Sequence, residues 1–127
     1  MRFYLVSLLL IVVAVVFYFA YDYAVYSRWR ISATEARRRL GRGEFDVVLD
    51  VRTAAERATL GYFPNSIHVP AADLEKAIPE LYPNKETSIL IYCNTGHRAR
   101  LAADKLHALG YVNTYYISSP HTSIMRS

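Results

Sequence analysis

The sequence predicts an α/β domain, a parallel sheet with helices on both faces, preceded by one transmembrane helix. Near the N-terminus, an apolar run from Phe3 to Ala20 carries no charged residue. After residue 30, short apolar runs of strand length alternate with segments of helical periodicity. This alternation indicates a parallel sheet, because the crossover between two parallel strands usually contains a helix. A chain of 127 residues has room for one such domain.

The apolar run has the length of a membrane-spanning helix. About 20 residues, at a rise of about 1.5 Å each, cross the ~30 Å hydrocarbon core of a bilayer. Aromatic residues at its end stand where an interfacial belt would lie, namely Tyr18, Tyr21, Tyr23, Tyr26 and Trp29. We therefore expect residues 1–27 to be a transmembrane anchor with its interfacial flank, in contact with the membrane over residues 3–21.

Basic residues predict the orientation of this single-pass anchor. Only Arg2 precedes the run, whereas the residues that follow it include Arg28, Arg30, Arg37, Arg38, Arg39 and Arg42. The positive-inside rule then places the domain in the cytoplasm. The alternative is a cleaved signal peptide and an exported domain, but the run is longer than a typical signal core and no Ala-x-Ala site follows it. The arginines at 37–39 either contact anionic lipid or form a solvated helix face.

Local signals place the remaining elements. In chain order they are a helix over 32–40, a strand over 45–51, a helix from 53 to about 61, a strand over 66–69, a helix over 72–81, a strand over 88–93, a helix over 97–109 and a strand over 111–117. Capping boxes beginning at Ser32 and Thr53 open the first two helices, and Gly110 follows the last one. We expect one domain over 28–117 and a flexible tail over 118–127.

Composition excludes several classes of function. The single cysteine excludes an intramolecular disulfide and a zinc site built from several thiolates. His68, His107 and His121 lack the spacing of metal ligands and are expected to be structural or exposed. The net charge of +4 comes without any nucleic-acid motif. We therefore expect no metal, no cofactor and no nucleic-acid partner.

The informative stretch follows the strand predicted over 88–93. That strand delivers Cys93 to its carboxyl end, where open α/β sheets bind their ligands. A short loop with Gly96 and then a helix follow, so loop N–H groups, the helix N-terminus and Arg98 would favour a thiolate. An isolated cysteine in such a place is usually a small buried hydrophobe. The spacing Cys-x4-Arg, with glycine inside the loop, favours a reactive thiol instead.

At these residues the chain resembles the rhodanese-like (sulfurtransferase) domains. The resemblance runs from Ile31 to Ile117 and is carried by Asp50-Val51-Arg52, Glu56, the segment from Gly61 to Pro70 and the loop from Cys93 to Arg98. It implies that Cys93 takes sulfane sulfur from thiosulfate or a persulfide and passes it to cyanide, a thiol or a protein acceptor. The implied binding residues are Asn94, Thr95, Gly96, His97 and Arg98.

The same resemblance implies that Asp50, Arg52 and Glu56 brace the neighbouring loop. The alternative is a surface ion pair between Arg52 and Glu56, where such a pair contributes ~0–1 kcal/mol. His97 either assists anion binding or is solvated at the start of its helix.

Two alternatives to sulfur transfer remain open. Related phosphatases and arsenate reductases have five residues between cysteine and arginine, whereas this chain has four, which suits a single sulfur atom better than a tetrahedral oxyanion. A non-catalytic module that recruits a partner at the membrane is the other alternative. The sequence reads Ser118 to Ser127 where the family continues into a C-terminal helix. We expect the absence of this helix to expose one side of the sheet and to weaken the support of the cysteine loop.

Overall fold

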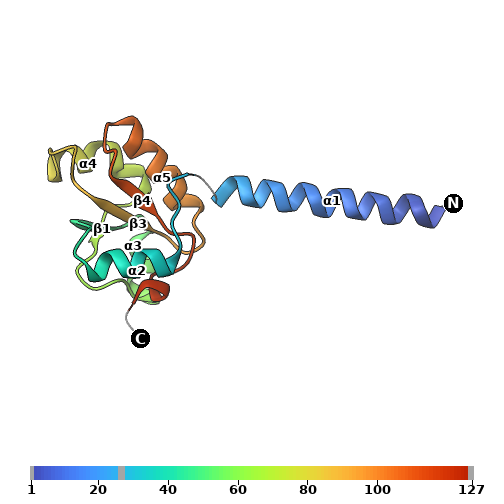
Figure 1. Ribbon diagram of the computed structural model, residues 1–127, viewed down its shortest axis with the longest axis horizontal. Coiled ribbons are helices and arrows are strands. Elements are labelled where there is room, and N and C mark those ends of the chain that lie inside the picture. Colours follow the sequence, from blue (N-terminus) through green and yellow to red (C-terminus); the bar gives the residue numbers. More distant parts are fainter. Residues whose placement is uncertain (1, 26–27, 126–127) are drawn as a thin grey trace.

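The computed structural model describes residues 2–25 and 28–125. The helices are α1 (Arg2–Val25), α2 (Ala33–Gly41), α3 (Ala54–Leu60), α4 (Leu74–Leu81) and α5 (His97–Ala108), with 3-10 turns η1 (Ala71–Asp73) and η2 (His121–Ile124). The strands are β1 (Val47–Asp50), β2 (Ile67–His68), β3 (Ile89–Tyr92) and β4 (Thr114–Tyr116). The predicted α/β class is confirmed, and Figure 1 shows α1 extending away from the domain that the other elements form.

The four strands form one parallel sheet in the order β2-β1-β3-β4. In the register of the central pair, Val47 lies opposite Ile89 and Asp50 lies opposite Tyr92. Both central strands are buried along their whole length, which explains why they are apolar except for Asp50 at the end of β1. Because all strands are parallel, the segments that follow β1 and β3 begin at the same edge of the sheet.

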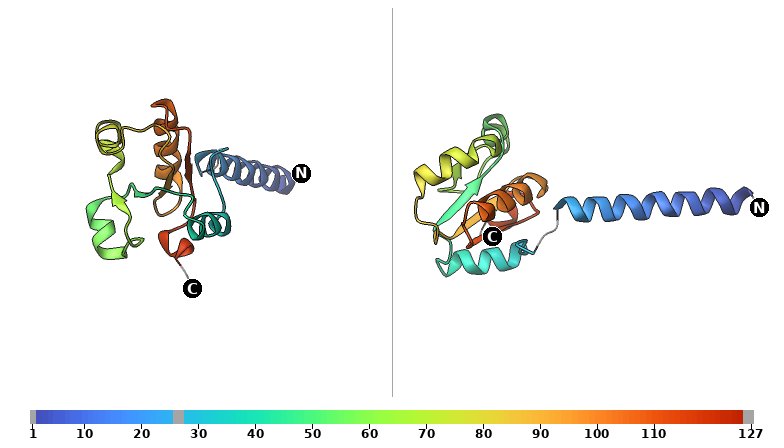
Figure 2. Two further views of the ribbon diagram at one scale, coloured as in Figure 1. Left: turned by 60° about the vertical axis from the view of Figure 1, so that its left-hand side comes forward. Right: turned by 90° about the horizontal axis from the view of Figure 1, so that it is seen from above.

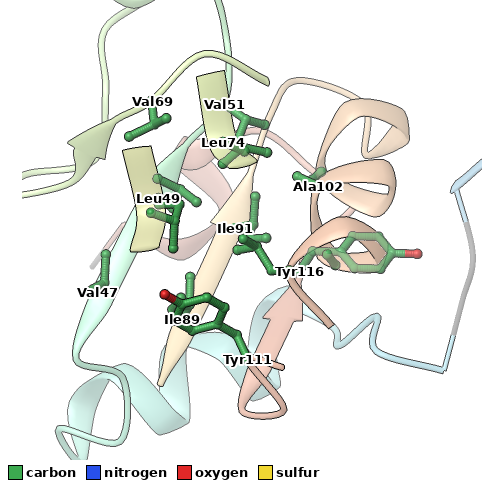
Figure 3. Close-up of a cluster of buried hydrophobic side chains, with 14 of the residues drawn as sticks. Val47, Leu49, Val51, Val69, Leu74, Ile89, Ile91, Ala102, Tyr111 and Tyr116 are labelled. Atoms are coloured by element: carbon green, nitrogen blue, oxygen red, sulfur yellow. The ribbon is translucent and has the colours of Figure 1, made fainter. Parts of the chain in front are cut away.

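Alternate side chains of the sheet enter two separate cores. Leu49 and Ile91 pack with α4 and α5 on one face (Figure 3), and Cys93 belongs to the same cluster. Val48 and Leu90 point to the other face, where they pack with residues of α2 and η2. Figure 2 shows α4 and α2 on opposite sides of the sheet. The prediction of helices on both faces is therefore confirmed.

The segment that follows α1 is joined to the free edge of β4. The Ile31 amide donates to the Tyr116 carbonyl at 2.9 Å, and the Tyr116 amide donates to the Trp29 carbonyl at 3.1 Å. The Trp29 ring stacks on His107 of α5, with ring centroids 3.7 Å apart. These bonds cover an edge that would otherwise present unpaired N–H and C=O groups.

The two predicted capping boxes differ in the structure. At the start of α3, the Thr53 hydroxyl accepts from the Glu56 amide, and the Glu56 carboxylate accepts from the Thr53 amide in return. At the start of α2, Ser32 accepts from the Glu35 amide at 3.0 Å, while the Glu35 carboxylate pairs with Arg38 and Arg39. Glu35 therefore pairs with two of the three arginines at 37–39, whose predicted alternatives are lipid contact and a solvated helix face.

The C-terminal segment differs from the predicted flexible tail. Residues 121–124 form η2, which contacts α2, and the side chains of His121 and Ile124 are buried. Arg37 of α2 donates to the Ser123 carbonyl at 2.7 Å. The sheet face that was expected to be exposed is therefore covered by α2 and this short turn. Residues 126–127 lie outside the described part of the chain.

Ile124 provides a test of this packing. Replacing Ile124 by alanine removes a side chain that is 3 % exposed, and we expect the free energy of unfolding to fall by about 2–4 kcal/mol. Chemical unfolding of the full chain in detergent, followed by Trp29 fluorescence, measures the change. Met125→Ala, at an exposed neighbouring position, is the matched control and should change stability little. Equal stability of both variants would contradict a packed η2.

One helix of the described residues is long and apolar enough to cross a membrane. It covers Arg2–Tyr23, and none of its most apolar window is buried in the protein. A signal sequence has the same length and composition. Of the predicted aromatic belt, Tyr18, Tyr21 and Tyr23 lie on the exposed surface of this helix, whereas Tyr26 lies outside the described residues.

Candidate active site

Cys93 follows β3 and lies at the carboxyl end of the sheet. Its side chain is 1 % exposed, and its sulfur accepts hydrogen bonds from the Gly96 amide at 3.1 Å and from the Ala99 amide at 3.4 Å. Both amides belong to the start of α5, where the first N–H groups have no partner within the helix. The loop is therefore folded around the sulfur, with N–H donors directed at an atom that can carry negative charge.

Gly96 makes this arrangement possible. Its backbone φ is +103°, in the left-handed region that favours glycine, and it stands immediately before α5. A β-carbon at this position would lie 2.5 Å from the Ser118 Cβ and 2.6 Å from its Cα. The chain that leaves β4 thus packs directly against the cysteine loop.

Glu56 connects the start of α3 to the same loop. Arg98 donates to the two oxygens of the Glu56 carboxylate at 2.6 and 2.8 Å, and the Asn94 amide donates to it at 2.6 Å. The hydrogen bonds from Arg98, followed by that from the Thr53 amide, hold the pKa of Glu56 well below its usual range. The carboxylate in turn raises the pKa of Arg98. Glu56 therefore caps α3 and fixes both ends of the cysteine loop.

We call the contacts of Glu56 with Asn94 and Arg98 the clamp. A buried polar network lies beneath the clamp, on the opposite face of the sheet from the sulfur. Asp50 and Arg52, whose side chains are fully buried, form a two-point ion pair. Burial alone would raise the pKa of Asp50, but the hydrogen bonds and charge of Arg52, with a further bond from the Tyr92 hydroxyl, lower it overall. Arg57 also donates to Asp50, at 3.1 Å. Through its bond to the Gly61 carbonyl, at 2.6 Å, Arg52 holds the chain that follows α3.

The structure thereby excludes a surface ion pair between Arg52 and Glu56. Arg52 pairs with Asp50 in the interior, and Glu56 at the start of α3 pairs with Arg98 at the start of α5. The reason is topological, because β1 and β3 are neighbours and bring the segments after them together. The structure brings Asp50, Arg52 and Glu56 close to the cysteine loop, and their role as braces stays a prediction.

The predicted binding residues are gathered in one loop but differ in exposure. Gly96 is buried and Asn94 is half-buried, whereas Thr95 and His97 are exposed on the outer side of the loop. Arg98 is half-buried and borders a hollow of about 210 Å³, which lies between η1 and α5. The residues that line this hollow are Ala71, Ala72, Leu74, Arg98, Leu101, Ala102 and Lys105.

Several supporting residues were not predicted from the sequence. Arg57, Ser66 and Tyr92 complete the polar network, with the Arg57 guanidinium 3.0 Å from the Ser66 hydroxyl. Ser118 contacts Gly96, and the buried His121 ring packs against Tyr92 at a centroid distance of 5.8 Å. Burial, and then the charge of Arg52, lower the pKa of His121. The expectation that this histidine is structural agrees with its position. These long-range contacts have no signal in local spacing.

Metal binding has no support among the described residues, where no group of three or more His, Cys, Asp or Glu side chains is placed to hold an ion.

Comparison with known proteins assigns the domain. The sequence pattern of the rhodanese-like domain matches residues 32–119, more than half of the chain. The chain belongs to the rhodanese-like domain family. Among curated proteins, none matches the sequence. The matched range includes the cysteine loop, Ser118 and the three residues Asp50, Arg52 and Glu56.

Solved structures resemble this rhodanese-like domain. A human single-domain sulfurtransferase is 25 % identical, with a TM-score of 0.64, over 76 % of this chain and 95 % of its own. A rhodanese-related protein from Thermoplasma volcanium is 25 % identical, with a TM-score of 0.63, over 75 % of this chain and 88 % of its own. A Rhodopseudomonas palustris protein described as a possible tyrosine phosphatase shares the fold, at 23 % identity and a TM-score of 0.69, over 82 % of this chain and 84 % of its own.

The clamp of the rhodanese-like domain is tested by Glu56→Gln. Glutamine can still cap α3 but cannot form an ion pair with Arg98, so we expect a loss of about 1 kcal/mol of stability. Because folding lowers the pKa of Glu56, the stabilisation is present above the unfolded value of ~4.3 and is lost as the pH falls below it. Urea unfolding at pH 7 and at pH 3 measures both effects. Glu44→Gln, at an exposed position, is the control. An equal loss for Glu56→Gln at both pH values would contradict the ion pair.

Proposed function

We propose that this rhodanese-like domain is a sulfurtransferase that carries sulfur as a persulfide on Cys93 and is anchored to a membrane by α1. The observation that supports it best is the position of the Cys93 sulfur, which accepts N–H bonds from Gly96 and Ala99. Donors directed at one atom stabilise negative charge on that atom without reorganisation during the reaction. A persulfide, like a thiolate, carries such a charge.

The loading step transfers one sulfur atom. The Cys93 thiolate attacks the outer sulfur of thiosulfate, a sulfur–sulfur bond forms on the protein, and sulfite leaves with the electron pair of the broken bond. The donor carries two negative charges, so the nearby Arg98 favours its approach, while its pairing with Glu56 keeps the guanidinium in place. Thr95 and His97 occupy the exposed side of the loop, where the donor enters.

The unloading step needs an acceptor from outside the chain. With a single cysteine, no second thiol of the same chain can attack the persulfide. A thiolate or cyanide attacks the outer sulfur, takes it, and leaves Cys93 as a thiolate again. A protein thiol is a further candidate acceptor. Neither step uses a cofactor or a metal.

We assign α1 to the membrane anchor and the domain to the cytoplasmic side. The anchor assignment follows from the length and apolar exposure of Arg2–Tyr23, and the orientation follows from the arginines after the span. Fractionation of membranes, with protease protection of the domain, tests both. Recovery of a shortened chain in an exported fraction would instead support a cleaved signal sequence.

Mass spectrometry of the intact protein tests the persulfide. Treatment with thiosulfate, without reductant, should add the mass of one sulfur atom, and addition of cyanide or a thiol should remove it. Cys93→Ser should show no addition. Ser is close in size to Cys, so unfolding of this variant is a small risk, and circular dichroism checks it. An unmodified wild-type protein would contradict the proposal.

One observation favours a second candidate, a non-catalytic binding module. The sulfur of Cys93 is almost inaccessible, and a module that only binds a partner has no need of an accessible thiol. The two candidates differ in turnover, because only the enzyme releases sulfite continuously from thiosulfate in the presence of cyanide. A protein that binds thiosulfate without releasing sulfite would support the binding module.

A further inference from the structure

The end of α1 lies against the start of α5. The guanidinium carbon of Arg100 stands 5.0 Å from the centre of the Tyr23 ring, and the two helices are in contact. Figure 1 shows α1 leaving the domain on the side of α5. Tyrosines at the end of a membrane span settle at the level of the lipid headgroups. The contact therefore brings the first turns of α5 to that level.

The cysteine loop is attached to the same turns. Ala99, the neighbour of Arg100, donates its amide to the Cys93 sulfur at 3.4 Å. Residues of one α-helix are fixed to each other at a rise of about 1.5 Å per residue, so the loop follows the position of Arg100. Two consecutive residues therefore connect the Tyr23 ring to the Cys93 sulfur: Arg100 contacts the ring, and Ala99 bonds to the sulfur.

The surface around these turns suits a membrane interface. Leu101 is 47 % exposed and lines the hollow beside Arg98, together with the cationic Lys105. Arg100 adds a third cation. Each of the three has a carboxylate beside it: Glu56 for Arg98, Asp104 for Arg100 at 3.9 Å, and Glu75 for Lys105 at 3.7 Å. An exposed leucine among ion pairs suits a headgroup region, which offers apolar chains next to groups of both charges.

We propose that the start of α5 rests on the headgroup layer and that Cys93 exchanges its sulfur with a thiol held at the membrane surface. This inference rests on the anchor and on the persulfide proposed above. The thiolate of the membrane-held acceptor attacks the outer sulfur of the persulfide. The new sulfur–sulfur bond forms on the acceptor, and the electron pair of the broken bond returns to Cys93. The step needs no oxidant or reductant.

Site-specific labels test the placement without using the chemistry. In the full-length Cys93→Ser protein, Leu101→Cys and Val112→Cys each introduce one thiol for a fluorophore at an exposed apolar position. Val112 is the matched control, because it precedes β4 and lies at the amino end of the parallel sheet. In phosphatidylcholine vesicles with a headgroup-attached quencher, we expect loss of fluorescence at residue 101 and its retention at residue 112. Equal quenching, or quenching at residue 112 alone, would overturn the proposal.

A second experiment tests the acceptor with the wild-type protein. In the first arm, the protein is inserted into vesicles that contain a small fraction of thiol-headed phospholipid. In the second arm, the protein is inserted into thiol-free vesicles, and the thiol-headed phospholipid is supplied in separate vesicles without protein. A thiol in the same membrane benefits from a high effective concentration, so we expect discharge of the persulfide to be on the order of 100-fold faster in the first case. Equal rates would overturn the inference. A failure to form the persulfide would instead contradict the proposed function, and the labels would still report the placement.

Discussion

Asp50→Asn is expected to lower the free energy of unfolding by about 3–5 kcal/mol, because it leaves the Arg52 guanidinium buried without its counter-charge. One Asp50 oxygen accepts from the Arg52 amide at 2.9 Å and from its Nε at 3.0 Å. The other accepts from Arg52, Arg57 and the Tyr92 hydroxyl, at 2.9, 3.1 and 3.0 Å. Asparagine has no negative charge, and its NH2 group would face donors instead of acceptors.

The effect of Asp50→Asn should depend on pH in one direction. Folding lowers the pKa of Asp50, so the carboxylate stabilises the fold above its unfolded value of ~3.9, and this stabilisation is lost as the pH falls below that value. The difference between wild type and variant should therefore be largest near neutral pH and shrink in acid. Denaturant unfolding of the full chain at several pH values measures it. Asp73→Asn, at an exposed aspartate, is the control, and a similar small loss at both positions would argue against the buried network.

Gly96→Ala is expected to cost about 2–4 kcal/mol of stability and to displace the cysteine loop. The left-handed backbone at φ +103° strains any residue with a β-carbon. The new methyl group would lie 2.5 Å from the Ser118 Cβ, so the backbone at Ser118 or the loop itself must move. Because the Gly96 amide bonds to the Cys93 sulfur, such a movement removes a donor from that sulfur. Loading of sulfur from thiosulfate should fall more than stability alone explains.

Gly41→Ala is the matched control for this change. Gly41 ends α2, and a β-carbon there would have no atom within 4 Å. This variant should be as stable as the wild type or slightly more so, because alanine reduces the entropy of the unfolded chain. Thermal unfolding and the rate of sulfur loading are measured for both variants. Normal loading by Gly96→Ala would mean that the cysteine loop does not need its present backbone conformation.

The sequence was sufficient for features that depend on nearby residues. The apolar run over 3–20 defines a helix long enough for a membrane, whatever the rest of the chain does. The capping box from Thr53 to Glu56 forms as predicted, since both partners lie within one helical turn. Mostly apolar runs predicted the two central strands, although each strand is shorter than its run. The spacing from Cys93 to Arg98 located the candidate site because the loop is a single segment.

Only the tertiary structure decided which partner each charged residue takes. Glu56 lies four residues from Arg52 in sequence, yet it pairs with Arg98, because the sheet order places β1 beside β3. The order itself has no local signal, since any arrangement of parallel strands has the same apolar pattern. Arg52 pairs with Asp50 because both side chains enter the same buried face of the sheet.

In the C-terminal segment, too, tertiary packing decides a feature that the local sequence does not predict. Its polar sequence predicts a flexible tail, but Ile124 and His121 fill the space that the sheet and α2 leave beside Tyr92. The burial of one isoleucine cannot be predicted from its neighbours, because it depends on a surface built by residues about 30 to 90 positions away. The sequence by itself determined the elements and located the cysteine loop, while the packing of distant segments decided how that loop is held and which side of the domain it faces.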